Sequence, residues 1–241
     1  MKYVGSKNRL SKQLAPIIQS YVDKGCNAYI EPFVGGSNMI DKINHPHKYG
    51  YDSHKHLIAL LKQAQTNTSV FPKSIDKQTY QYVKERINDN SFPDWFVGLV
   101  SFCASYNGKW FGGYANGVKT KIGTVRNYTD EAITNLIKQA PNLVGINFAY
   151  CDFRNILIDE LGGNVIYCDP PYRGTTKYAT DTFPYDEYYN WCRKLSKGNI
   201  VLCSEYWMPD NFEIVWEGQL TCTLDKSSRT KKVERLYLCH C

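Results

Sequence analysis

The pattern of apolar and polar residues changes along the chain, and its first part predicts alternating helices and strands. Apolar side chains at helical spacing predict an amphipathic helix over residues 11–23. Short apolar runs over residues 27–33 and 48–52 predict strands, and a further helix is expected over residues 54–65. Strands that alternate with helices are typical of an α/β fold with a parallel sheet.

Between residues 67 and 145 the strand pattern is lost and helical spacing replaces it. Helices are expected over residues 76–88, 92–106 and 129–140. The polar stretch between the last two, residues 107–128, is long for a connection within a compact domain, and such loops are usually functional or disordered. We therefore expect a mainly helical insertion over residues 67–145.

The α/β pattern then returns and continues to the end of the chain. The expected elements are a strand at 146–152, a helix at 153–161, a strand at 164–168, a helix at 186–195, a strand at 199–204 and late strands at 212–217 and 234–239. Residues 1–66 and 146–241 are thus predicted to form one discontinuous domain around the insertion.

The strand at 164–168 leads into Asp169-Pro170-Pro171-Tyr172, which carries the strongest chemical signal in the chain. Two prolines cannot continue a strand, so an acid and a tyrosine are left at its carboxyl end, where open α/β sheets bind their ligands. Because proline has no N–H, the carbonyls of Asp169 and Pro170 are expected to accept hydrogen bonds from another group. Such a site suits a planar molecule with an amino group, whereas a simple proline turn is the alternative.

Two further signals follow the first two strands. Glycines in the turn Val34-Gly35-Gly36 allow the backbone to approach a ligand closely, and Asp52 lies 17 positions beyond Gly35. An acid at roughly this spacing, about 20 residues, binds ribose hydroxyls in nucleotide-type βαβ units. The glycines match neither the dinucleotide pattern nor a phosphate-cradling loop, which favours a ligand with a ribose but no pyrophosphate.

Composition indicates the kind of partner, the cellular compartment and the state of the cysteines. The 241 residues carry a formal net charge of +6, with 19 tyrosines and 5 tryptophans, which favours a nucleic-acid partner. No run approaches the roughly 18 apolar residues of a membrane span, so a soluble cytosolic protein is expected. The nine cysteines include no Cys-x-x-Cys pair, and Cys239-His240-Cys241 lacks a second ligand pair. We expect reduced, mostly buried thiols and no metal.

The polar stretch at 107–128 interleaves aromatic residues with basic ones. Its basic residues are Lys109, Lys119, Lys121 and Arg126. Cations bind phosphate and aromatic rings stack on bases, so this stretch predicts a nucleic-acid surface, with a solvated loop as the alternative.

The glycine turn after the first strand, Asp52 after the second and Asp-Pro-Pro-Tyr after a later one together resemble S-adenosylmethionine-dependent amino-methyltransferases that act on adenine in DNA. The motif order, with Tyr3–Lys7 first and the insertion before Asp-Pro-Pro-Tyr, is similar to the Dam-like, alpha-group family. The similarity extends to Tyr106-Asn107-Gly108 and to Arg229-Thr230-Lys231-Lys232-Val233-Glu234. It implies a class I (Rossmann-like) methyltransferase sheet, an S-adenosylmethionine-binding catalytic domain and a target-recognition domain over residues 67–145.

The resemblance also implies roles for single residues. Asp169 and the Pro170 carbonyl would accept hydrogen bonds from the amine of a flipped-out adenine, and Tyr172 would stack on the base. The expected cofactor residues are Tyr3, Lys7, Phe33, Gly35, Asp52, Asp152, Phe153 and Asp169, with Lys7 on the cofactor's carboxylate and Asp52 on its ribose. The expected DNA contacts are Lys2, Tyr106, Asn107, Lys109, Lys119 and Arg126. The segment 173–178 is expected to close over the flipped base.

One position departs from the family pattern and several alternatives stay open. Dam-like enzymes usually carry a base-reading arginine four residues after the asparagine of Tyr-Asn-Gly, where this chain has Phe111. Phe111 is expected to wedge between bases or to contact a thymine methyl, which predicts a target different from GATC. The alternatives are a cytosine amino-methyltransferase, an RNA adenine methyltransferase and a non-catalytic DNA-binding protein on the same scaffold.

We thus expect a monomer that acts on double-stranded DNA in the cytoplasm of a bacterium, or of a bacterial host if the protein comes from a phage. The sequence does not indicate whether a restriction partner exists.

Overall fold

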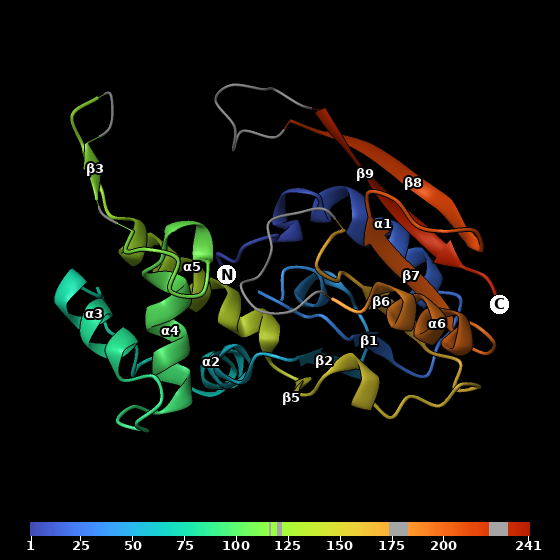
Figure 1. Ribbon diagram of the computed structural model, residues 1–241, viewed down its shortest axis with the longest axis horizontal. Helices are drawn as coiled ribbons and strands as arrows, with labels where there is room; N and C mark the ends of the chain where they lie inside the picture. The colour runs from blue at the N-terminus through green and yellow to red at the C-terminus, as the bar shows by residue number, and fades with distance from the viewer. Residues whose placement is uncertain (116, 120–121, 174–182, 222–230) are drawn as a thin grey trace.

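The computed structural model describes residues 1–115, 117–119, 122–173, 183–221 and 231–241. Its main sheet has seven strands in the order β5-β2-β1-β6-β7-β9-β8 (Figure 1). Their bounds are β1 Tyr29–Glu31, β2 Lys48–Asp52, β5 Ile146–Tyr150, β6 Val165–Cys168, β7 Ile200–Glu205, β8 Phe212–Thr221 and β9 Lys231–Cys239.

The first five strands in this order are parallel, and β9 runs antiparallel to both of its neighbours. The chain leaves β1 toward β2 on one side and returns to β6 on the other side, which makes the β1/β6 boundary the topological switch point of the sheet. This arrangement confirms the predicted α/β, class I (Rossmann-like) methyltransferase sheet. A ligand site is expected at the carboxyl ends of the strands beside the switch point.

Helices cover both faces of the sheet, because its central strands are apolar on both sides. In β6 the side chains of Val165 and Tyr167 join a core that includes α1 (Ser11–Val22), whereas Ile166 and Cys168 join a second core that includes α6 (Tyr185–Leu195). All four of these β6 residues are buried. Alternate residues of one strand thus pack on opposite helical layers, and Asp169 emerges between the layers.

The insertion lies to one side of the sheet (Figure 1). Its elements are α3 Lys77–Glu85, α4 Asp94–Cys103, the 3-10 helix η3 Tyr106–Gly108, the strand pair β3 Val118–Lys119 and β4 Val125–Arg126, and α5 Tyr128–Leu143. Helices α4 and α5 pack against α2 (Lys55–Thr66). A Cβ on Gly98 would lie 2.2 Å from the His56 carbonyl oxygen, so this glycine permits the close approach of α4 to α2.

Several elements of the structure differ in extent from those expected from the sequence. The helix expected at 153–161 is wrong: only the 3-10 helix η4 Phe153–Asn155 forms. Leu157 is fully exposed and Leu161 is 76% exposed, so the segment lacks an apolar face that packing could stabilise. The helices expected at 76–88 and 92–106 are shorter, and the loop 107–128 contains η3, β3 and β4 rather than being without structure.

Two short 3-10 helices complete the described structure, η1 Lys7–Arg9 and η2 Ile40–Lys42. None of the helices in the described residues combines the length and the apolar composition that a membrane span requires.

Candidate active site

Four parallel strands present predicted site residues at one edge of the sheet. Phe33 follows β1, Asp52 ends β2, Asp152 follows β5 and Asp169 follows β6 directly. Because the carboxyl ends of parallel strands meet at the same edge, the structure brings together residues that lie far apart in the sequence. The edge includes the switch point.

Asp52 is bound by the backbone of two loops. Its Oδ2 accepts a hydrogen bond from the Gly35 N–H at 3.1 Å, and its Oδ1 accepts one from the His54 N–H at 3.0 Å. Burial raises the pKa of this carboxyl to about 6, although both hydrogen bonds act to lower it. The acid is therefore fixed in position and ionised at neutral pH, as a ribose diol would require.

The glycine turn makes room for Tyr3. A Cβ on Gly36 would lie 2.8 Å from the Tyr3 Cβ, and one on Gly35 would lie 3.0 Å from the Tyr3 Cε1. Gln139 of α5 donates hydrogen bonds to the Gly36 carbonyl at 3.2 Å and the Ser37 carbonyl at 2.9 Å. The Tyr3 ring also contacts Phe102 of α4, with centroids 5.5 Å apart. The insertion therefore holds the glycine turn and Tyr3 in place.

An aromatic surface lies where β1 and β5 end. The Phe33 and Phe153 ring centroids are 5.5 Å apart, and Phe183 lies 5.8 Å and 5.7 Å from them. Beside Phe153, Asp152 forms a two-point ion pair with Arg154 at 2.8 and 3.0 Å, and this hydrogen bonding lowers the Asp152 pKa. Such a surface can hold a flat heterocycle. Sequence reasoning missed Phe183, whose only signal was an aromatic residue just before the helix at 185.

Asp169 lies in a buried charge network that the sequence did not predict. The Lys7 Nζ lies 2.7 Å from the Asp169 Oδ1 and 3.4 Å from the Glu234 Oε1, and Tyr172 donates a short hydrogen bond to the same Glu234 oxygen. The Lys7 ammonium also lies 4.4 Å from the centre of the Tyr172 ring. One cation thus joins the acid and the tyrosine of Asp-Pro-Pro-Tyr to a glutamate of β9.

The pKa shifts in this network follow from burial and charge. Burial raises the pKa of Asp169 and that of Glu234, and in each case Lys7 partly offsets the rise. Burial acts to lower the Lys7 pKa, but the two carboxylates outweigh burial and raise it. Lys7 thus stays charged and favours the ionised form of Asp169. The resemblance placed Lys7 on the cofactor's carboxylate, whereas the structure places its ammonium on Asp169.

Residues of α6 and of the end of β7 contact the segment around Tyr172. Tyr185 of α6 donates a hydrogen bond to the Pro171 carbonyl at 3.0 Å, and the Tyr206 ring meets the Tyr172 ring edge to face at 4.8 Å. The Arg173 N–H donates to the Glu205 Oε1 at 2.7 Å. The rest of the segment expected to close over the base, residues 174–178, lies outside the described residues.

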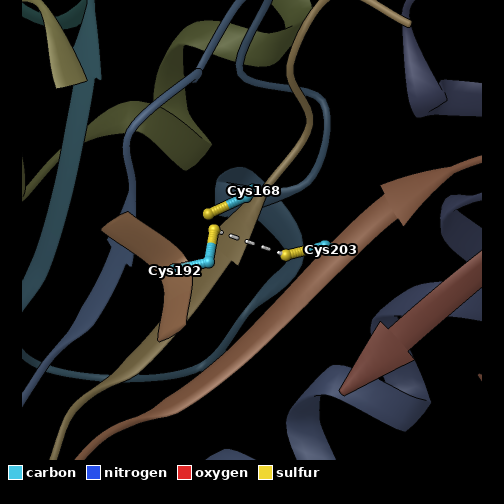
Figure 2. A group of neighbouring side chains, drawn as sticks. All are labelled: Cys168, Cys192 and Cys203. Carbon is cyan, nitrogen blue, oxygen red and sulfur yellow. Dashed lines mark hydrogen bonds between the residues drawn. The ribbon is translucent and has the colours of Figure 1, made fainter. Parts of the chain in front are cut away.

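Three thiols cluster at the end of β6, directly before Asp169. Figure 2 shows Cys168 of β6, Cys192 of α6 and Cys203 of β7 pointing toward one another, and their sulfur atoms lie within 4.8 Å of one another. All three are fully buried and unbridged, as expected of reduced core thiols. Burial raises the pKa of Cys168 and Cys192, whereas hydrogen bonds from the neighbouring thiols and Tyr188 lower that of Cys203. The three side chains belong to the apolar core that includes α6.

The predicted DNA contacts divide into two groups. In the first group, Lys2 and Arg126 lie against the ring of Tyr128, 4.9 Å and 5.0 Å from its centre. Arg126 also forms a two-point ion pair with Glu131 at 2.6 and 2.8 Å. Its guanidinium is therefore bound within the protein in this state, where we predicted a base contact.

Most of the second group is exposed to solvent. Tyr106 is 60% exposed, and Lys109 and Lys119 are exposed as well. Asn107 has a left-handed backbone with φ of 56°, and a Cβ on Gly108 would lie 2.6 Å from the Lys2 carbonyl oxygen. Tyr-Asn-Gly thus packs tightly on the N-terminal segment. Lys121 lies outside the described residues.

The expectation for Phe111 is wrong. Its side chain is only 8% exposed, and its ring packs against Tyr80 at 5.3 Å and Trp110 at 5.0 Å. An apolar ring finds a better environment in the core of the insertion than in solvent, so this residue is unavailable to wedge between bases.

Comparisons with known proteins identify the family of the chain. The chain is 22% identical over 198 residues to the type II methyltransferase M.FokI of Planomicrobium okeanokoites, a match that covers 75% of this chain and 30% of that protein's length. It also aligns with SMU.472, a proposed methyltransferase complexed with SAH, at 8% identity and a TM-score of 0.35, over 95% of this chain and 53% of the other. A family model matches residues 3–219, and the chain belongs to the D12 class N6 adenine-specific DNA methyltransferase family.

Proposed function

We propose that this chain transfers a methyl group from S-adenosylmethionine to the exocyclic amine, N6, of an adenine flipped out of duplex DNA. The observation that carries the proposal is the partly buried Asp169, which lies at the switch-point edge, forms an ion pair with Lys7 and shares this edge with the predicted cofactor residues. Membership of the D12 class family supports the same reaction.

The residues of the edge fit the cofactor. Asp52 offers two carboxylate oxygens to ribose hydroxyls, and the aromatic surface of Phe33, Phe153 and Phe183 offers a place for an adenine ring. When bound, S-adenosylmethionine supplies an electrophilic methyl group on a sulfonium. Asp152 lies beside the aromatic surface and would meet the cofactor's base.

The chain's own residues then act on the target base. The adenine amine is a weak nucleophile because its lone pair is delocalised into the ring. Hydrogen bonds from the amine to Asp169 and to the Pro170 carbonyl favour a geometry in which the lone pair can attack, and Tyr172 stacks on the base. Lys7 favours the ionised form of Asp169, which is the form that accepts. Positioning then supplies much of the rate, and flipping the base costs a few kcal/mol that protein contacts offset.

Analysis of the methylated nucleosides tests this function. The protein would be incubated with labelled S-adenosylmethionine and either duplex DNA or RNA, and the products digested to nucleosides. We expect N6-methyldeoxyadenosine from DNA alone. Label in N4-methyldeoxycytidine or in RNA would identify one of the alternative methyltransferases, and cofactor binding without transfer would identify a non-catalytic DNA-binding protein.

Asp52 should make cofactor binding depend on pH. The carboxylate accepts from ribose hydroxyls, so affinity should rise as pH rises through about 6, where Asp52 ionises, and level off above that pH. Asp52→Asn should remove this slope and weaken binding at about pH 8 by about 1–3 kcal/mol. Calorimetry across this range checks both effects. Asp152→Asn is the matched control, because the pKa of Asp152 is lowered and adds no slope there. Equal affinities for wild type and Asp52→Asn would remove Asp52 from the site.

We assign the choice of target sequence to the insertion, residues 67–145, and catalysis to residues 1–66 and 146–241. Asparagine can pair with adenine at two points in the major groove, whereas lysine on a phosphate carries no sequence information. Under this proposal Tyr106 and Asn107 contact bases, and the exposed Lys109 and Lys119 contact phosphates. Arg126 would read a base only after leaving Glu131.

Replacing Asn107 and replacing Lys119 should therefore have different effects on DNA recognition. Asn107→Gly suits the left-handed backbone, and it should relax discrimination at one base pair by about 1–3 kcal/mol. Lys119→Ala should weaken all duplexes alike and reduce the salt dependence by about one phosphate contact. Methylation of a library of sites around a fixed adenine, at several salt concentrations, separates the two. An equal loss on every site for both variants would show that the insertion only clamps DNA.

We further propose that the protein acts as a monomer on double-stranded DNA in the cytoplasm of a bacterium or of a phage-infected host. A gel-filtration profile that matches one chain's mass, with and without a short duplex, would agree with this proposal.

A further inference from the structure

Glu205 is a buried acid that the proposed reaction does not yet use. It ends β7, the parallel neighbour of β6, and Cys203 pairs with Cys168 in the register of the two strands. Glu205 lies two positions beyond this last pair, and its carboxyl group contacts Arg173, the residue that follows Asp-Pro-Pro-Tyr. The residue is 2% exposed. It stands at the same edge of the sheet as Asp169, because β6 and β7 are parallel neighbours.

Only one of its two carboxyl oxygens accepts a hydrogen bond of normal geometry within the described residues. The Oε1 accepts the Arg173 N–H at 2.7 Å, directly after Tyr172, whereas the buried Oε2 has no hydrogen-bond partner among the described residues. A desolvated oxygen left without a hydrogen bond is destabilising. A glutamine would accept from Arg173 equally well, so the backbone contact alone does not explain an acid here. The unpaired oxygen indicates a ligand.

The surroundings favour the neutral carboxylic acid over the carboxylate. Burial raises the Glu205 pKa to about 7, the Arg173 and Tyr206 N–H groups act to lower it, and Glu234 and Asp169 raise it further. Lys7 is already bound to Asp169 and Glu234. The titratable and charged groups that face Glu205 are Asp169 and Arg173 after β6, Tyr185 and Tyr189 of α6, and Glu234 and Tyr237 of β9. In its acid form Glu205 can donate a hydrogen bond.

A flipped adenine needs such a donor. Its amine donates two hydrogen bonds, which Asp169 and the Pro170 carbonyl accept, but the ring nitrogens that flank the amine, N1 and N7, are acceptors. Pro170 and Pro171 have no N–H to offer them. We propose that Glu205, as a carboxylic acid, donates its Oε2 hydrogen to a ring nitrogen that flanks the target amine and so positions the base. This inference rests on the proposed methylation of adenine.

The pH dependence of methyl transfer tests the proposal. Single-turnover rates would be measured for wild type and Glu205→Gln on a duplex with one target adenine, between about pH 6 and about pH 8.5. For an acid form with a pKa of about 7, the wild-type rate should fall about thirtyfold over this range. Glutamine keeps an acceptor for Arg173 and an N–H donor at every pH, so its rate should not fall. Ionisation of Asp169 acts in the opposite direction and cannot produce the fall.

Base analogues identify the nitrogen. With 1-deazaadenine or 7-deazaadenine at the target, one substitution should slow wild type by at least about tenfold, because a buried donor is left unpaired. The loss should largely disappear in Glu205→Met, which cannot donate. If Glu205→Met does not fold, the pH profiles of wild type and Glu205→Gln still test the proposal.

A wild-type rate that is flat through pH 7, an equal fall in Glu205→Gln, or full activity of wild type on both analogues would overturn the assignment of Glu205. These results leave the proposed function intact, since they require methylation of adenine. A wild type that methylates no adenine at all would overturn the proposed function itself.

Discussion

Replacing Asp169 by alanine is expected to lower the rate of methyl transfer by at least about 10³-fold. The amine would lose the acceptor that directs its lone pair, and the Lys7 ammonium, 2.7 Å from the Asp169 Oδ1 in the wild type, would be left as a donor where an acceptor is needed. Lys7 would keep Glu234 as a partner, so the fold should survive. DNA binding should change little, because the exposed cations of the insertion are untouched.

The test measures three quantities on the same preparation: the single-turnover rate of methyl transfer, the cofactor affinity by calorimetry and the affinity for DNA. Asp169→Asn keeps the shape of the side chain and one acceptor oxygen, and its loss should be smaller than that of alanine. Asp152→Ala is the matched control, an acid at a neighbouring strand end that would affect cofactor affinity rather than the chemical step. Full turnover by Asp169→Ala would disprove the mechanism proposed for this site.

The fold was predictable from the sequence where one local pattern determines one element. The apolar run that ends at Cys168 is buried on both faces, and two prolines stop it, so the strand and the position of Asp169 follow from a few adjacent residues. Asp52 was predictable for the same reason, because a short strand and a glycine turn fix its place relative to Gly35. The helix expected at 153–161 failed because spacing alone does not reveal whether a neighbour will cover the apolar side chains, and Leu157 has none.

Local sequence patterns did not predict the contacts between site residues that lie far apart in the sequence. Lys7 lies before α1, Asp169 after β6 and Glu234 within β9, and only the strand order brings the three together. Glu205 was equally hidden, since an acid at the end of a strand is commonly exposed, and only its burial and its unpaired oxygen distinguish it. Phe111 was misassigned because it occupies the position of the family's base-reading arginine, and an apolar ring at that position packs into the core instead. The sequence therefore predicted the positions of the site better than the pairing within it.

Replacing Lys7 by methionine is expected to lower the free energy of unfolding by about 3–5 kcal/mol at about pH 8. Methionine fills a similar volume but leaves Asp169 and Glu234 as two buried carboxylates without their cation. Denaturant unfolding of wild type and variant measures the difference. Lys194→Met is the matched control, because Lys194 also lies 2.7 Å from a carboxylate oxygen, of Glu160, but is 63% exposed. Its loss should be about 0–1 kcal/mol.

The pH dependence distinguishes a lost ion pair from lost packing. Without Lys7 the pKa values of Asp169 and Glu234 in the folded state should rise further above their unfolded values, since burial already raises both. A raised pKa of an acid means that stability is lost as pH rises through the folded pKa, so the deficit of Lys7→Met should shrink as pH falls and both groups become protonated. Relative to wild type at the same pH, methyl transfer by Lys7→Met should be weaker at neutral pH and recover partly at higher pH, where Asp169 ionises again. Adding Glu234→Gln should restore part of the stability, because it removes one of the two unpaired charges. A deficit that is independent of pH and unchanged by Glu234→Gln would show that Lys7 acts through packing, and the ionised state of Asp169 would then need another source.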